Sequence, residues 1–128
     1  MLNRSLAAVS VAVLCCAVSA PVAQAKPVDV QGTATCTSPV KAKVKAGPRA
    51  VQRVKTNVQI DDVRAGIVRN ITVVDGVQTR TATATTAGAS GSIDRDFFTR
   101  DNAGADTVTF TAARADGSKT CSGTVTVG

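Results

Sequence analysis

Short runs in which apolar and polar residues alternate constrain this chain more than any other feature of its sequence. Between Val28 and Thr37 the even positions are small or apolar and the odd positions are polar. The run from about Ala50 to Ile60 repeats the pattern, with one face made of Val54, Thr56, Val58 and Ile60 and the other of Arg53, Lys55, Asn57 and Gln59. A period of two is that of a strand with one buried face, so these runs predict β-structure.

Further strands are predicted at residues 41–46, 67–74, 77–86 and 93–99, separated by glycine, proline, asparagine and aspartate. Gly47-Pro48 should end the strand that begins at Lys41, because proline cannot donate to a central ladder. Asp75-Gly76 predicts a two-residue hairpin turn. Strict pairing across that turn sets Ile71 beside Arg80 and Val73 beside Gln78, so that apolar residues lie next to polar ones. Either the register slips by a bulge, or the polar residues lie at a sheet edge.

The C-terminal segment predicts a register most clearly. With a turn at Asp116-Gly117, one face holds the pairs Ala112 with Cys121, Phe110 with Gly123, and Val108 with Val125. The other face holds only hydroxyl side chains, those of Thr107, Thr109, Thr111, Ser122, Thr124 and Thr126. Agreement on both strands around one turn specifies the register, because a slip of one residue would invert every side chain.

The first 25 residues predict a secretory signal peptide. Arg4 precedes an apolar run from Leu6 to Val18, and Ala23 and Ala25 are the small residues expected before a cleavage site. A transmembrane anchor is the alternative, but the apolar run is shorter than the roughly 20 residues that span a bilayer. We therefore expect cleavage after Ala25 and a secreted, extracellular domain of residues 26–128 without a transmembrane segment.

Removal of the signal leaves two cysteines, Cys36 and Cys121. An even number of cysteines in an oxidising compartment predicts that they form a disulfide. Both are expected on the core faces of their strands, which makes a bridge across the core geometrically feasible. In the chain-entropy model, a bridge that closes most of the domain contributes about 4 to 5 kcal/mol to stability.

Seven or eight short strands in about 100 residues, with one disulfide, predict an all-β, immunoglobulin-like sandwich of antiparallel strands. The segment from Phe98 to Val127 resembles the closing strands of bacterial immunoglobulin-like and cadherin-like modules. Those strands commonly end in an "aGaDtvtFta…DG…tvtV" pattern, here Asn102 to Asp106, Phe110 and Asp116-Gly117. The resemblance implies adhesion, spacing or partner binding. The chain lacks the core tryptophan, and the tyrosine before the second cysteine, of antibody domains.

The composition argues against catalysis. The chain has no histidine, tryptophan or tyrosine, and all its acidic residues are aspartates. With the mature cysteines bridged, the usual general bases, nucleophiles and zinc ligands are missing. A Ser-Lys dyad is the remaining catalytic alternative, but no motif points to one. We therefore expect a protein that is not an enzyme and has no cofactor.

A calcium site is a second possibility for the segment rich in aspartate. Calcium binds several carboxylate and amide oxygens, and the candidates are Asp94, Asp96, Asp101, Asn102 and Asp106. The alternative is a polar loop in which Asp and Asn serve turns, with Arg95 and Arg100 neutralising the acids. We favour the polar loop and expect no metal.

A basic segment is the sharper candidate for a site. It contains six cations and no acid: Lys41, Lys43, Lys45, Arg49, Arg53 and Lys55. The three lysines should project from one side of a strand, forming a ridge that could bind an anionic envelope polymer, a lipid surface or nucleic acid. Alternatively, lysines on an exposed edge strand discourage pairing between sheets. Specific nucleic-acid binding is disfavoured, because so few aromatic residues are available for stacking.

Adjacent aromatic residues suggest a contact with a partner. Phe97 and Phe98 are neighbours in a strand, so one should face the core and the other could contact an extracellular protein. Our leading interpretation is a non-catalytic binding or structural module with an unknown target. The alternative is a cationic effector associated with an anionic polymer. A third possibility is a protease inhibitor that presents the loop at residues 87–92.

Overall fold

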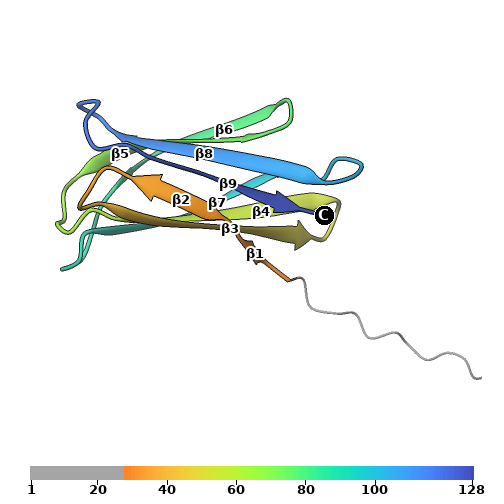
Figure 1. The fold of residues 1–128 in the computed structure, drawn as a ribbon, viewed down its shortest axis with the longest axis horizontal. Coiled ribbons are helices and arrows are strands. Elements are labelled where there is room, and N and C mark those ends of the chain that lie inside the picture. Colours follow the sequence, from red (N-terminus) through yellow and green to blue (C-terminus); the bar gives the residue numbers. More distant parts are fainter. Residues whose placement is uncertain (1–27) are drawn as a thin grey trace, which may run out of the picture.

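The computed structural model describes residues 28–128, which form two antiparallel β-sheets. The strands are β1 (Val30–Gln31), β2 (Thr33–Cys36), β3 (Lys41–Arg49), β4 (Arg53–Asp61), β5 (Val68–Asp75), β6 (Gln78–Thr85), β7 (Ser92–Arg100), β8 (Asp106–Arg114) and β9 (Cys121–Val127). Sheet A has the order β1-β3-β4-β7 and sheet B the order β2-β9-β8-β5-β6 (Figure 1). The predicted all-β sandwich is confirmed. The predicted signal peptide lies outside the described residues, and none of residues 28–128 forms a helix able to cross a membrane.

The strand count is nine because the first predicted strand is divided at Gly32. β1 pairs with β3 in sheet A, whereas β2 pairs with β9 in sheet B, so the chain changes sheets at this residue. The Gly32 N–H donates to the carbonyl of Val44 at 2.8 Å. A Cβ at Gly32 would overlap the carbonyl of Thr124 and the side chain of Val125. Glycine therefore allows the close backbone approach that the crossing requires.

The core lies between the sheets, where alternate residues of the strands meet. Its largest apolar members include Val44, Val54, Val58, Ile60, Ile71, Val73, Phe97, Val108 and Phe110. The predicted inward face of β4 is confirmed. The predicted register of the last hairpin is also confirmed, with Ala112 opposite Cys121 and Phe110 opposite Gly123.

Two strand predictions need correction. β3 does not end before Gly47-Pro48 but continues to Arg49, with Pro48 opposite Val54. β1 pairs only with Lys45 and Ala46, so Pro48 lies where β3 is an edge strand, and proline is tolerated there. The second correction concerns the β5–β6 hairpin, whose turn residues differ from those predicted.

In that hairpin the turn is Gly76-Val77, one residue later than predicted, and Asp75 pairs with Gln78. The shift sets Ile71 opposite Ala82 and leaves Val73 opposite Arg80. Gly76 has a φ of 62°, a left-handed conformation that glycine adopts at little cost. β6 is an edge strand of sheet B, so the exposed Arg80 reaches solvent from the inner face.

The predicted disulfide is confirmed, but it does not cross the core. Cys36 and Cys121 lie directly opposite each other on β2 and β9, with their Cα atoms 4.0 Å apart. The crossing at Gly32 had already brought the chain into sheet B before Cys36. The bridge therefore fastens the edge strand β2 to its neighbour and closes a loop between residues 85 positions apart.

A buried ion pair joins the sheets at the end of the sandwich that carries the disulfide. Arg69 and Asp62 are both 0% exposed, and the Nε and Nη2 atoms of Arg69 each lie 2.6 Å from a carboxylate oxygen of Asp62. Nη1 of Arg69 donates to the carbonyls of Ala112 and Lys119. Arg114 adds a second ion pair to Asp62 at 3.1 Å. The cluster satisfies the buried charges, as burial of a charge requires.

The ion pair also affects the titration of Asp62. Burial alone would raise the pKa of this carboxyl, but the hydrogen bonds from Arg69 and Arg114 outweigh it, so the pKa is lowered. A lowered folded-state pKa contributes stability above the unfolded value, and this stability is lost as the pH falls through the folded value.

Replacement of both cysteines by serine should lower the free energy of unfolding by about 4 to 5 kcal/mol, because the unfolded chain regains the entropy of an open loop. Urea unfolding at pH 7 measures the change. The native protein in reductant is the matched control and should show a similar loss. A loss below about 1 kcal/mol would contradict the assignment of the bridge as the main covalent constraint.

The substitution Asp62→Ala should lower the free energy of unfolding by about 3 to 5 kcal/mol, since it leaves the Arg69 guanidinium buried without its partner. Because this variant could fail to fold, the double variant Asp62→Leu, Arg69→Met provides a second measurement. It should recover most of the loss, because apolar residues of similar volume often replace a buried pair at little cost. Denaturant unfolding of a double variant as unstable as the single variant would refute this account.

Candidate functional site

The outward surface of sheet A, which we call the basic face, carries all six cations of the predicted segment. Directly opposite residues of an antiparallel pair share a face, and Arg49 lies opposite Arg53 while Lys45 lies opposite Asn57. Their neighbours Val44 and Val54 are buried, so the cations point away from the core. The structure thus brings onto one surface the residues Lys41, Lys43, Lys45, Arg49, Arg53 and Lys55.

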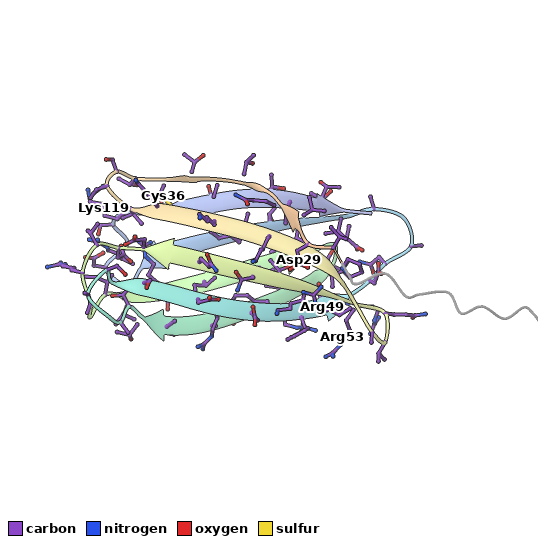
Figure 2. All side chains as sticks on the ribbon, turned by 90° about the horizontal axis from the view of Figure 1, so that it is seen from below. Asp29, Cys36, Arg49, Arg53 and Lys119 are labelled. Atoms are coloured by element: carbon purple, nitrogen blue, oxygen red, sulfur yellow. A yellow bond between two sulfur atoms is a disulfide. The ribbon has the colours of Figure 1, made fainter. Side chains whose placement is uncertain are left out.

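Three arginines form a row across the basic face at one end. Arg49 lies opposite Arg53, and Arg53 lies opposite Arg100 on β7. Figure 2 shows Arg49 and Arg53 at one end of the molecule, with Cys36 and Lys119 at the other. Arg100 was not predicted to belong to this site, because the pairing of β4 with β7 cannot be read from local alternation. Like charges directly opposite one another are destabilising, so the row requires compensation.

Asp29 compensates one member of the row. Nη1 and Nη2 of Arg49 donate to the two carboxylate oxygens of Asp29 at 2.9 and 3.2 Å. The hydrogen bond from Arg49 lowers the pKa of Asp29, and the same bond raises the pKa of Arg49. Arg53 has no such acid; its guanidinium carbon lies 4.7 Å from the ring centroid of Phe98, a cation–π contact.

The structure separates the two adjacent phenylalanines as expected for a strand. Phe97 is 6% exposed and packs in the core, whereas Phe98 is 39% exposed on the basic face. Of the two candidate partner contacts, only Phe98 is accessible. Its ring supports Arg53 and forms part of the arginine-rich end of the face.

The lysines of β3 form no ion pairs with other described residues, although Lys41 lies opposite Asp61. Among residues 28–128, no carboxylate lies within ion-pair distance of Lys41, Lys43 or Lys45. Lys41 and Lys43 lie on the part of β3 that β1 does not cover, so edge protection explains these two. It does not explain Arg53 and Lys55, because β4 is an interior strand between β3 and β7.

The candidate calcium ligands are divided between two places. Asp94 and Asp96 lie on the basic face, where the side-chain amide of Asn57 donates to both at 2.6 and 2.8 Å. Asp96 also lies 3.5 Å from the amine of Lys55. Asp101 and Asp106 lie at the end of the sandwich instead. Within the described part of the chain, no group of three acidic or thiol ligands is arranged to hold a metal ion.

Two buried carboxyls meet at that end of the core. Asp75 is 1% exposed and Asp106 is 3% exposed, and the two lie close enough for Asp106 to affect the pKa of Asp75. One oxygen of Asp75 accepts from the hydroxyl of Thr99 at 2.7 Å, and one of Asp106 accepts from Asn102. The other oxygen of each has no further partner among residues 28–128. Burial raises the pKa of Asp75, and the adjacent Asp106 raises it further despite the opposing bond from Thr99.

The loop considered for protease inhibition is closed on itself. Ala87 and Ser92 exchange two backbone hydrogen bonds of 3.1 and 3.0 Å. The carbonyl of Gly91 accepts from the N–H of Asp62 at 2.9 Å. This tight turn differs from the extended loop that an inhibitor presents to a protease.

Comparison with known proteins finds no relative of this chain, which matches no protein-family model, no curated protein and no solved structure.

The substitution Asp75→Asn should stabilise the protein at pH 7. Folding raises the pKa of Asp75, so its stabilising contribution is lost as the pH rises through the folded value. An asparagine cannot ionise, can still accept from Thr99, and can donate to the unpartnered oxygen of Asp106. Urea unfolding should show a higher midpoint than the native protein at pH 7, and the gain should disappear below the ordinary carboxyl value of about 3.9. A lower midpoint at pH 7 would contradict the acid pair.

Proposed function

We propose that this chain is a secreted, non-catalytic binding module that associates with an anionic extracellular polymer through the basic face. The observation that carries the proposal is the common orientation of the six cations and Arg100 on one surface. Charges gathered on one surface act together on a polymer that carries regularly spaced anions. Scattered cations could not contact one polymer chain together.

The interior position of several cations favours binding over edge protection. Arg53 and Lys55 on β4 have β-strand neighbours on both sides, so they are not needed to block pairing with another sheet. The lysines of β3 extend the same surface along its length. Release of counterions from the polymer then supplies the affinity, which falls as the salt concentration rises.

The other parts of the proposal rest on the sequence. The predicted signal peptide supports secretion, and the confirmed disulfide fits an oxidising compartment. The lack of histidine, glutamate and free mature cysteine supports a non-catalytic role. The resemblance to bacterial immunoglobulin-like modules favours the same class, since such modules bind or space rather than catalyse.

A binding experiment with purified residues 26–128 tests the proposal. Affinity for two polymers, polyglutamate and inorganic polyphosphate, would be measured by titration calorimetry across a salt series. The test variant changes Lys41, Lys43 and Lys45 to glutamine. We expect weaker binding to both polymers and a salt slope reduced by about one for each lysine that contacts the polymer.

The matched control removes the same number of charges away from the basic face, by changing Arg64, Arg95 and Lys119 to glutamine. It should bind almost as the native protein does. Equal losses in both variants would indicate a response to net charge alone and would contradict a defined binding surface. A native protein that binds neither polymer would reject polyanion binding and direct attention to a protein partner at Phe98.

A further inference from the structure

An open depression of about 400 Å³ lies beside the arginine row, where the edges of β6 and β7 meet. We call it the arginine pocket. Its lining residues come from the β3–β4 turn and three strands, and those used here are Gln52, Arg53, Gln78, Arg80, Phe98 and Arg100. Arg80 belongs to sheet B, so the pocket combines residues of both sheets. Only Arg53 and Phe98 had been identified from the sequence.

Three arginines line the pocket without a neutralising acid among residues 28–128. Within the described residues three arginines have carboxylate partners: Arg49 pairs with Asp29, and Arg69 and Arg114 pair with Asp62. Within residues 28–128, no carboxylate lies within ion-pair distance of the three pocket arginines, Arg53, Arg80 and Arg100. Gathered cations with unused N–H donors are arranged to receive an oxyanion.

Hydrogen bonds to the backbone hold the walls of the pocket. Nε of Arg80 donates to the carbonyl of Phe98 at 3.2 Å, and Nη1 donates to that of Thr79 at 3.2 Å, which leaves Nη2 free. The side-chain oxygen of Gln78 accepts from the N–H of Arg100 at 2.8 Å. These bonds join β7 to β6, so the guanidinium of Arg80 and the backbone of Arg100 are held in place before any ligand arrives.

The β3–β4 turn forms the remaining wall in a strained conformation. Val51 and Gln52 have φ values of 64° and 53°, and a β-branched residue in this left-handed region is unusual. The carbonyl of Gln52 accepts from the N–H of Asp101 at 2.8 Å, which ties the turn to the β7–β8 loop. Strain of this kind often marks a functional site.

We propose that the arginine pocket binds a phosphate group and is the anchoring subsite of the basic face. The proposal rests on the proposed function and names its ligand class. Guanidinium forks match phosphate oxygens, and three forks approaching from three strands suit a group with several exposed oxygens better than a planar carboxylate. The phosphate could belong to a repeating polymer or to a free phosphorylated molecule, and both present the same oxygens.

The test replaces the guanidinium groups of the three arginines by the amines of lysine. In the variant Arg53→Lys, Arg80→Lys, Arg100→Lys the net charge is unchanged but bidentate bonding is lost. Its affinities for polyphosphate and polyglutamate would be compared with those of the native protein at equal salt. We expect the native protein to prefer polyphosphate, and the variant to lose about tenfold in polyphosphate affinity with little change toward polyglutamate. The urea midpoint of the variant checks that it is folded.

Inorganic phosphate separates the two sources of the ligand. A native protein whose Arg100 amide resonance shifts with phosphate, but not with chloride at equal ionic strength, binds the free ion in the pocket. If that shift occurs but the protein binds neither polymer, phosphate binding in the arginine pocket is supported and the proposed polymer function is rejected. If both polymers bind equally well and the lysine-substituted pocket changes neither affinity, the basic face stands and the phosphate subsite is refuted.

Discussion

The buried contact between Arg69 and Asp62 is the interaction on which the arrangement of the two sheets most depends. Asp62 directly follows the last residue of β4 in sheet A, and Arg69 is the second residue of β5 in sheet B, so their contact holds the segment that carries the chain between sheets. The same guanidinium donates to the carbonyl of Ala112 on β8 and to that of Lys119 in the β8–β9 loop. One side chain therefore aligns four segments at the end where the disulfide fastens β2. At the opposite end of β5, Asp75 closes the core with the facing Thr99.

The two outer surfaces of the sandwich have different chemistry. Sheet A carries the arginines and lysines, with two aspartates among them on β7, Asp94 and Asp96. Every strand of sheet B carries threonine at outward positions, and β9 adds Ser122. Some of these residues lie opposite one another, such as Thr33 with Thr124 and Thr72 with Thr81. No outward position of these five strands holds a charged residue. Threonine suits an exposed strand position because its branched side chain fits the pleated surface.

Much of this fold could be predicted from local patterns, because the period of two reveals which residues of a strand face the core. The inward faces of β4, β8 and β9 and the pairing of Ala112 with Cys121 followed from alternation alone. The order of the strands in each sheet could not be predicted in this way, because no local pattern shows that the chain changes sheets at Gly32 or that β7 pairs with β4. For that reason the disulfide was expected across the core, and Arg80 and Arg100 were missed. Arg69 carried a usable signal, because it shares the inward parity of Ile71 and Val73.

If the basic face binds an anionic layer as we propose, the two unlike surfaces orient the molecule at that boundary. A copy that adsorbs to an anionic layer through sheet A exposes the uncharged, hydroxyl-rich outward face of sheet B to the medium. The outward positions of sheet B have no cations with which to recruit a second layer of polymer. Coverage would therefore stop at a monolayer, and an anionic boundary covered in this way would meet its surroundings as an uncharged, hydrated coat.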